Sequence, residues 1–149
     1  MPRLSSSAAA YVALQRVADL LGRDMAALLK DEGLSATQYN VLRILRGAGE
    51  AGCACGEVAA RMITKDPDVT RLLDRMEKQG WIARERGTTD RRVVTVRITK
   101  AGLTLVHRLD GPVEARHRET LGRLGAPRLS ALTGELEALE SLLTGESSK

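Results

Sequence analysis

Residues 87–99, GTTDRRVVTVRIT, bring together side chains that suit the binding of an anion. A turn-forming segment carries Asp90, Arg91 and Arg92, and a run of alternating residues follows it, which predicts a hairpin with both arginines at its tip. Because a hairpin tip reaches far into solvent, its guanidinium groups are free to enter a groove of a partner. This chemistry indicates a negatively charged partner.

The distribution of charge supports the same interpretation. Residues 35–99 hold 12 Lys and Arg against 8 Asp and Glu, whereas the two flanks hold 11 of each, so the net charge of +4 lies in the middle segment. Basic residues concentrated in one segment favour a polyanionic partner. With no Phe, one Trp and two Tyr, the chain has few rings for stacking on unpaired bases, which argues against an RNA-binding platform.

Cysteine and histidine are the other residue types whose side chains could react or bind a metal ion. Cys53 and Cys55 do not make a disulfide framework, but a thiol near a helix N-terminus can be oxidised, so they are either redox-sensitive residues or small side chains that fill a loop. His107 and His117 lie ten positions apart on a predicted helix and hence on different faces, so we expect no metal site. The chain shows no triad and no phosphate-binding glycine loop, and we expect neither an enzyme nor a cofactor.

Length and composition bound the architecture. A chain of 149 residues with 43% hydrophobic residues predicts one compact globular domain. The short apolar run near the N-terminus is interrupted by Gln15 and Arg16, and no stretch reaches membrane-spanning length. We therefore expect a cytoplasmic protein with no membrane partner.

Helix signals dominate the first half of the chain. Apolar residues at spacings of three and four predict a helix over residues 8–30, ended by Gly33. A second helix begins at Ser35, because Ser35 and Gln38 match a capping box and Leu34 and Tyr39 match a hydrophobic staple. The glycines of residues 47–52 end that helix.

Two further helices follow. Residues 56–62 predict a short helix with a poor cap, because Ala54 stands where Ser or Thr would complete a capping box. The next helix has Asp66 as its cap, Pro67 at its first position and Gly80 as its end. One face of this helix is apolar, and the opposite face is polar and comprises Pro67, Thr70, Arg71, Asp74, Arg75 and Lys78.

The remaining elements are a hairpin and two helices. Residues 81–86 and 93–98 predict the two strands of the hairpin, and Thr99 caps a long helix that we expect to kink at Gly111 and Pro112. The last helix begins near Pro127. Its leucines repeat at alternating spacings of three and four, which predicts a heptad-like seam made of Leu129, Leu132, Leu136, Leu139 and Leu143.

The stretches LSATQYNVLRIL, GEVAARM and DPDVTRLLDRMEKQGWIARERGTTDRRVVTVRITKAG resemble the winged helix-turn-helix of the multiple-antibiotic-resistance regulator (MarR) family of transcription factors. The most specific part of this resemblance is Asp90-Arg91-Arg92, followed by alternating strand residues and residues 99–102. The resemblance implies a mainly α (α+β) fold, a winged helix-turn-helix with a two-stranded wing. The DNA-binding region would be residues 34–99, and residues 1–33 and 100–149 would form N- and C-terminal dimerisation helices.

The resemblance also implies a function. The chain would be a homodimeric, ligand-responsive repressor of transcription that binds double-stranded DNA at a pseudo-palindromic operator, with one helix in the major groove and Arg91 in the minor groove. The DNA-binding residues would be Lys65, Pro67, Asp68, Thr70, Arg71, Arg75, Arg86, Thr88, Asp90, Arg91 and Arg92. The dimerisation residues would be Leu14 and Leu21 of the first helix and the five leucines of the last helix. A small-molecule effector would bind between the two regions.

Two alternatives remain at this stage. The chain could sense oxidants through Cys53 and Cys55. It could also be a winged-helix module that binds proteins and has lost DNA binding, but the basic residues on the predicted recognition helix and at the hairpin tip argue against this.

Overall fold

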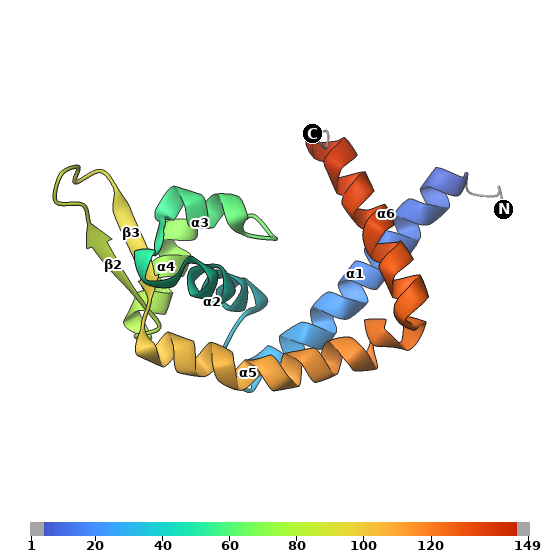
Figure 1. The fold of residues 1–149 in the computed structure, drawn as a ribbon, viewed down its shortest axis with the longest axis horizontal. Coiled ribbons are helices and arrows are strands. Elements are labelled where there is room, and N and C mark those ends of the chain that lie inside the picture. The colour runs from blue at the N-terminus through green and yellow to red at the C-terminus, as the bar shows by residue number, and fades with distance from the viewer. Residues whose placement is uncertain (1–4, 146–149) are drawn as a thin grey trace. The chain divides into compact units, whose positions relative to one another are not determined.

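The computed structural model describes residues 5–145, which form a mainly helical fold with a small antiparallel sheet (Figure 1). The predicted fold class is confirmed. In chain order the elements are α1 (Ser6–Lys30), α2 (Ala36–Ala48), the 3-10 helix η1 (Gly49–Ala51), β1 (Cys53–Ala54), α3 (Cys55–Arg61), α4 (Val69–Lys78), β2 (Ile82–Arg86), β3 (Val94–Ile98), α5 (Lys100–Glu119), the 3-10 helix η2 (Leu121–Leu124) and α6 (Ala126–Thr144).

The chain divides by its internal contacts into two compact units, Met1–Pro112 and Val113–Lys149, and α5 runs from the first unit into the second. The sequence predicts one compact domain and a functional division at residues 34 and 100, and that functional division stays a prediction. Residues 1–4 and 146–149, the ends of the two predicted dimerisation regions, lie outside the described residues.

The start of α2 confirms the predicted capping box. The Ser35 hydroxyl accepts a hydrogen bond from the backbone N–H of Gln38 (3.1 Å), and the Gln38 side chain accepts one from the backbone N–H of Ser35 (2.9 Å). These two bonds satisfy backbone donors that the first turn of a helix leaves without partners. The apolar face of α2 then carries Val41, Leu42 and Leu45, which are fully buried in the core of the first unit.

The sheet has the order β1-β3-β2 and both pairings are antiparallel. Strands β2 and β3 are the predicted hairpin, and their register pairs Ile82 with Ile98 and Arg86 with Val94. Figure 1 shows the loop between them extending beyond α3 and α4. The sequence analysis did not anticipate β1, a two-residue strand in which Cys53 pairs with Val96.

Helix α5 continues directly from the hairpin. As predicted, Thr99 caps it: the Thr99 hydroxyl accepts a hydrogen bond from the backbone N–H of Gly102 (3.1 Å) and donates one to the carbonyl of Gly80 (2.6 Å). Gly102 lies so close to the strand that a Cβ built on it would stand 2.3 Å from the carbonyl oxygen of Trp81. The helix remains continuous through Gly111 and Pro112, where the sequence predicts a kink.

The terminal helices leave apolar side chains on the surface of the chain. In α1, Leu29 is buried, but Leu14, Val17 and Leu20 are exposed. In α6, no residue is buried, and four of the five seam leucines, Leu132, Leu136, Leu139 and Leu143, are exposed. No helix within residues 5–145 has the length and apolarity required to cross a membrane.

Candidate nucleic-acid interface

Helix α4 begins later than the sequence predicts. Its N-cap is Asp68, whose carboxylate accepts a hydrogen bond from the backbone N–H of Arg71 (3.0 Å), and the first helical residue is Val69. Asp66 instead accepts from the backbone N–H of Asp68 (2.8 Å), and Pro67 lies in the turn between them. The predicted cap at Asp66 and the predicted placement of Pro67 in the helix are therefore wrong, because a tight turn at Asp66 brings the second aspartate to the helix end.

The exposed face of α4 is basic. Leu72, Leu73 and Met76 anchor the helix in the core, so Thr70, Arg71, Arg75 and Lys78 face solvent. Arg71 Nε lies 3.2 Å from the Asp68 carboxylate, and this Arg71 side chain remains 79% exposed. An ion pair this exposed contributes little to stability, so the guanidinium can exchange Asp68 for a phosphate or a base at low cost.

Lys65 has a different environment. Its Nζ donates hydrogen bonds to the carbonyl oxygens of Ala60 (2.8 Å) and Ala59 (3.2 Å) at the end of α3. An ammonium group in this position satisfies helix carbonyls that lack partners and complements the negative end of the helix dipole. Lys65 was predicted to bind DNA, and in the free chain it closes the C-terminal end of α3.

The hairpin tip is held by short-range hydrogen bonds. The backbone N–H of Gly87 donates to the carbonyl of Val93 (2.8 Å), that of Val93 donates to the carbonyl of Asp90 (3.2 Å), and the Asp90 side chain accepts from the backbone N–H of Arg92 (2.9 Å). Asp90 thus fixes the turn. The remaining predicted wing residues, Arg86, Thr88, Arg91 and Arg92, have exposed side chains.

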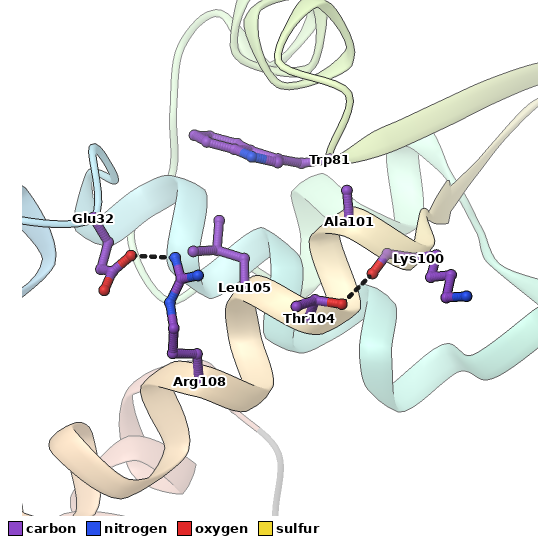
Figure 2. A pocket seen from close by; sticks show the side chains of 7 residues that line it. All are labelled: Glu32, Trp81, Lys100, Ala101, Thr104, Leu105 and Arg108. Carbon is purple, nitrogen blue, oxygen red and sulfur yellow. Dashed lines mark hydrogen bonds and ion pairs between the residues drawn. The ribbon is translucent and has the colours of Figure 1, made fainter.

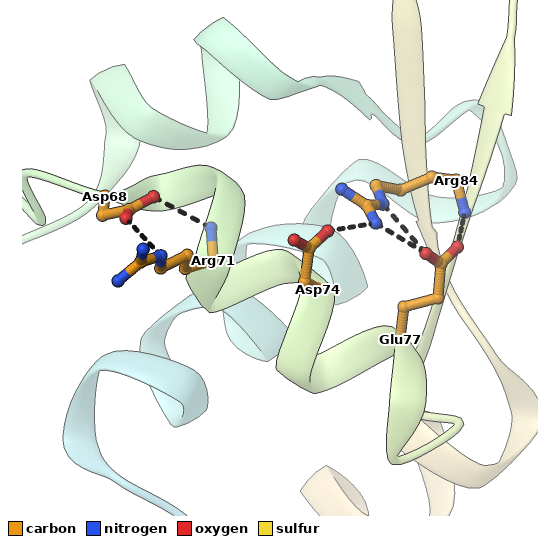
Figure 3. Close-up of polar contacts among 5 residues, drawn as sticks. All are labelled: Asp68, Arg71, Asp74, Glu77 and Arg84. Atoms are coloured by element: carbon orange, nitrogen blue, oxygen red, sulfur yellow. Dashed lines mark hydrogen bonds and ion pairs between the residues drawn. The ribbon is translucent and has the colours of Figure 1, made fainter.

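An ion-pair cluster that the sequence analysis missed joins the hairpin to α4 (Figure 3). Arg84 of β2 donates from Nη2 to Asp74 (2.5 Å) and Glu77 (2.7 Å), and from Nε to Glu77 (3.1 Å). Its backbone N–H also donates to Glu77 (3.0 Å). We call Asp74, Glu77 and Arg84 the clamp. The only signal in the sequence is the i, i+3 spacing of the two carboxylates.

The hydrogen bonds of the clamp shift the protonation equilibria of Glu77 and Arg84. Hydrogen bonds from Arg84 hold the pKa of the Glu77 carboxyl below its ordinary value, and the hydrogen bonds from Glu77 raise the pKa of the Arg84 guanidinium. Both shifts favour the charged forms of Glu77 and Arg84 at neutral pH.

The two cysteines lie at the join between β1 and α3. Cys53 is buried, and Arg61 Nη1 lies 3.4 Å from its sulfur. Cys55 is partly buried, and desolvation raises the pKa of its thiol despite the opposing effect of Arg84. A raised pKa reduces the fraction of reactive thiolate at neutral pH. Among the described residues, no three His, Cys, Asp or Glu side chains gather as they would around a metal ion.

An open hollow of about 530 Å³ lies between the end of α1, the start of β2 and the first turns of α5. Figure 2 shows the Trp81 ring above Ala101 and Leu105, with Glu32 facing Arg108 at one end and Lys100 at the other. The Glu32 carboxylate accepts a hydrogen bond from Arg108. The hollow therefore combines an aromatic surface with two cationic side chains, one of which already has an anionic partner.

The chain is similar to known proteins in sequence and in fold. A model of the MarR family matches residues 34–94. The homoprotocatechuate degradative operon repressor of Escherichia coli is 28% identical over 115 residues, which cover 77% of this chain and 76% of the relative. A MarR transcription factor from Planctomyces limnophilus is 37% identical, with 93% of this chain and 98% of that chain covered and a TM-score of 0.71. The MepR–DNA complex from S. aureus shares the fold at 16% identity, with 93% and 98% covered and a TM-score of 0.80.

Proposed function

Because the chain belongs to the MarR family of transcription factors, which are regulators and not enzymes, we propose that it represses transcription as a homodimer at a pseudo-palindromic operator. The sequence predicts a DNA-binding regulator without catalytic activity, and the relatives of the chain are transcriptional regulators of this kind. The observation that carries the proposal is the joint exposure of basic side chains on α4 and at the tip of the β2–β3 hairpin.

The two sets of basic residues suit different parts of a duplex. An exposed helix face with Thr70, Arg71 and Arg75 fits the major groove, where arginine reads guanine edges. An arginine at a narrow tip, such as Arg91, fits the minor groove, whose negative potential is strongest where the groove is narrow. In this proposal α4 is the recognition helix and the β2–β3 hairpin is the wing.

The homodimer is supported by the exposed apolar side chains of α1 and α6. Monomeric proteins rarely leave a row of leucines in water, and a second copy would cover the exposed apolar side chains of each helix. A twofold dimer would present two recognition helices to half-sites about 34 Å apart, which is one turn of the duplex.

Selection from a random pool of duplexes, followed by sequencing, tests the central claim. We expect an enriched site with two related half-sites in inverted orientation, and light scattering should give twice the mass of the chain. Enrichment of no sequence, together with equal affinity for every duplex, would show that the chain is not a sequence-specific regulator.

The hollow beside Trp81 is our candidate for the effector site. Trp81 is the only tryptophan of the chain, so its fluorescence reports ligand entry directly. We expect an anionic aromatic effector to quench this fluorescence and to weaken operator binding over the same concentration range. Arg108→Ala should abolish the quenching, whereas Arg16→Ala, the loss of an exposed arginine on α1, should not. Quenching without any change in operator affinity would show that a ligand bound in this hollow does not act as an effector.

The alternatives have less support. Burial of Cys53 and the raised pKa of Cys55 disfavour a thiol switch, so peroxide should release DNA no faster from the wild type than from a Cys53→Ser/Cys55→Ser variant. A peroxide-dependent release that disappears in the double variant would restore that alternative. The exposed arginines of α4 and of the wing tip equally disfavour a module that binds only proteins.

A further inference from the structure

The clamp is the principal polar connection between the wing and the recognition helix described above. A single wing residue, Arg84, makes side-chain hydrogen bonds to two carboxylates on successive turns of α4, and a fourth bond comes from its backbone. Figure 3 shows Asp74 and Glu77 both facing Arg84, while Arg71 and Asp68 lie further toward the N-terminus of the same helix. A planar guanidinium that binds two carboxylates fixes direction as well as distance.

The outer part of the wing has no comparable packing on α4. An open hollow of about 600 Å³ separates Thr70 and Leu73 of α4 from Arg92, Val93 and Val94 of the wing, and Arg84 forms part of its wall. The position of the wing tip relative to α4 therefore depends on the inner end of the hairpin, where Ile82 is buried and Arg84 holds the helix.

We propose that Arg84 is a positioning residue for DNA binding: through Asp74 and Glu77 it sets the wing tip relative to the recognition helix, so that both reach their grooves in one register. This inference depends on the proposed DNA-binding function. The grooves of a duplex have fixed spacing, so two binding elements joined rigidly at the correct spacing act together, and loosening their connection loses part of the joint affinity.

The clamp also has an electrostatic role that opposes its positioning role, and the two can be separated. Asp74 and Glu77 place two negative charges on the helix that would approach phosphates. Removing both charges should by electrostatics alone tighten binding to every duplex. Loss of positioning should instead weaken binding to the operator. It should have no effect of its own on binding to other sequences.

The test is therefore an Asp74→Asn/Glu77→Gln variant, measured on the selected operator and on a duplex of the same composition in scrambled order. We expect affinity for the scrambled duplex to rise and the ratio of operator to scrambled affinity to fall about tenfold. Glu50→Gln/Glu57→Gln removes two exposed carboxylates outside the clamp and is the matched control, for which the ratio should stay constant.

Two further variants address folding and rescue. Arg84→Lys keeps the charge but lacks the fork geometry, so the ratio should fall while thermal unfolding stays cooperative. Arg84→Glu should lose the operator preference, and adding Glu77→Arg should recover part of it because the pair is restored with opposite polarity.

An unchanged ratio in the Asp74→Asn/Glu77→Gln variant, or no recovery in the charge-swapped variant, would overturn the proposal. If the wild type itself shows no operator preference, the proposed function fails, and this outcome is distinct from a failure of the clamp.

Discussion

Arg71 and Arg91 are both exposed, but they belong to different elements, so their replacement should have different effects. Arg71 lies on α4 beside its ion-pair partner Asp68, whereas Arg91 lies at the wing tip fixed by Asp90. Arg71→Ala should cost about 1 to 3 kcal/mol of operator binding and relax the preference at one position of each half-site. Affinities for operators altered at single positions measure this effect.

Arg91→Ala should weaken binding to many sequences and reduce the slope of log affinity against log salt by about one phosphate per half-site. The effect should be largest where A·T-rich flanks narrow the minor groove. A salt titration with operator and scrambled duplexes provides the measurement, and Arg16→Ala serves as the control for the loss of one exposed positive charge. Normal affinity and a normal slope for Arg91→Ala would make the wing tip an ordinary charged turn.

Glu77 provides a prediction about pH. Its pKa in the folded chain lies below the ordinary value because Arg84 donates hydrogen bonds to it, so its contribution to stability is present above the unfolded pKa and is lost as the pH falls through the folded pKa. The difference in unfolding free energy between the wild type and Glu77→Gln should therefore shrink on acidification below about pH 4. Denaturant titrations across this range test it, and a constant difference would contradict it.

At the scale of elements, α2 and α4 show why some helix starts can be predicted and others cannot. The capping box of α2 joins Ser35 and Gln38, three residues apart, so the local sequence contains the whole interaction. Before α4, Asp66 and Asp68 are both suitable caps. In the structure the Asp66 side chain accepts a hydrogen bond from the backbone N–H of Asp68, and Asp68 caps the helix, so the sequence alone did not select between the two aspartates.

Long-range pairing limits the prediction of the site in the same way. The hairpin and its exposed tip followed from alternation and turn residues, and the arginines at the tip were identified correctly as exposed. Strand β1 has two residues and pairs with Thr95 and Val96 more than forty positions away, so no periodicity reveals it. The clamp is similarly hidden, because Arg84 had several carboxylates available as partners and only the packing of β2 against α4 selects two of them.

The packing between the wing and α5 can be tested by replacing two glycines of α5. A Cβ at Gly102 would stand 2.3 Å from the Trp81 carbonyl and 2.8 Å from Ile98, whereas a Cβ at Gly111 would meet nothing within 4 Å. Gly102→Ala should therefore lower the unfolding free energy by about 1 to 3 kcal/mol. Gly111→Ala should raise it by roughly 0.5 to 1 kcal/mol, because alanine favours the helix. Equal effects in thermal unfolding would contradict this packing.

At the scale of the whole molecule, the leucines of α6 test the proposed dimer. Leu136 lies on the seam and is 41% exposed in the single chain, and Leu142 lies off the seam and is 81% exposed. Leu136→Lys should place a charge in the interface and split or unfold the dimer. Leu142→Lys, the same change on the same helix, should leave the mass in light scattering unchanged. A wild type that is a stable monomer at micromolar concentration would remove the basis of the prediction.

The exposed leucines of α6 have a consequence for how such a regulator would respond to its own abundance. If the species that occupies the operator forms only when two chains cover these leucines, its concentration varies with the square of the chain concentration wherever single chains predominate. A twofold dilution of the chain would then reduce that species about fourfold. Dilution by cell growth, or a change in gene dosage, would thus change repression by more than it changes the concentration of the chain. This response would not require a bound effector.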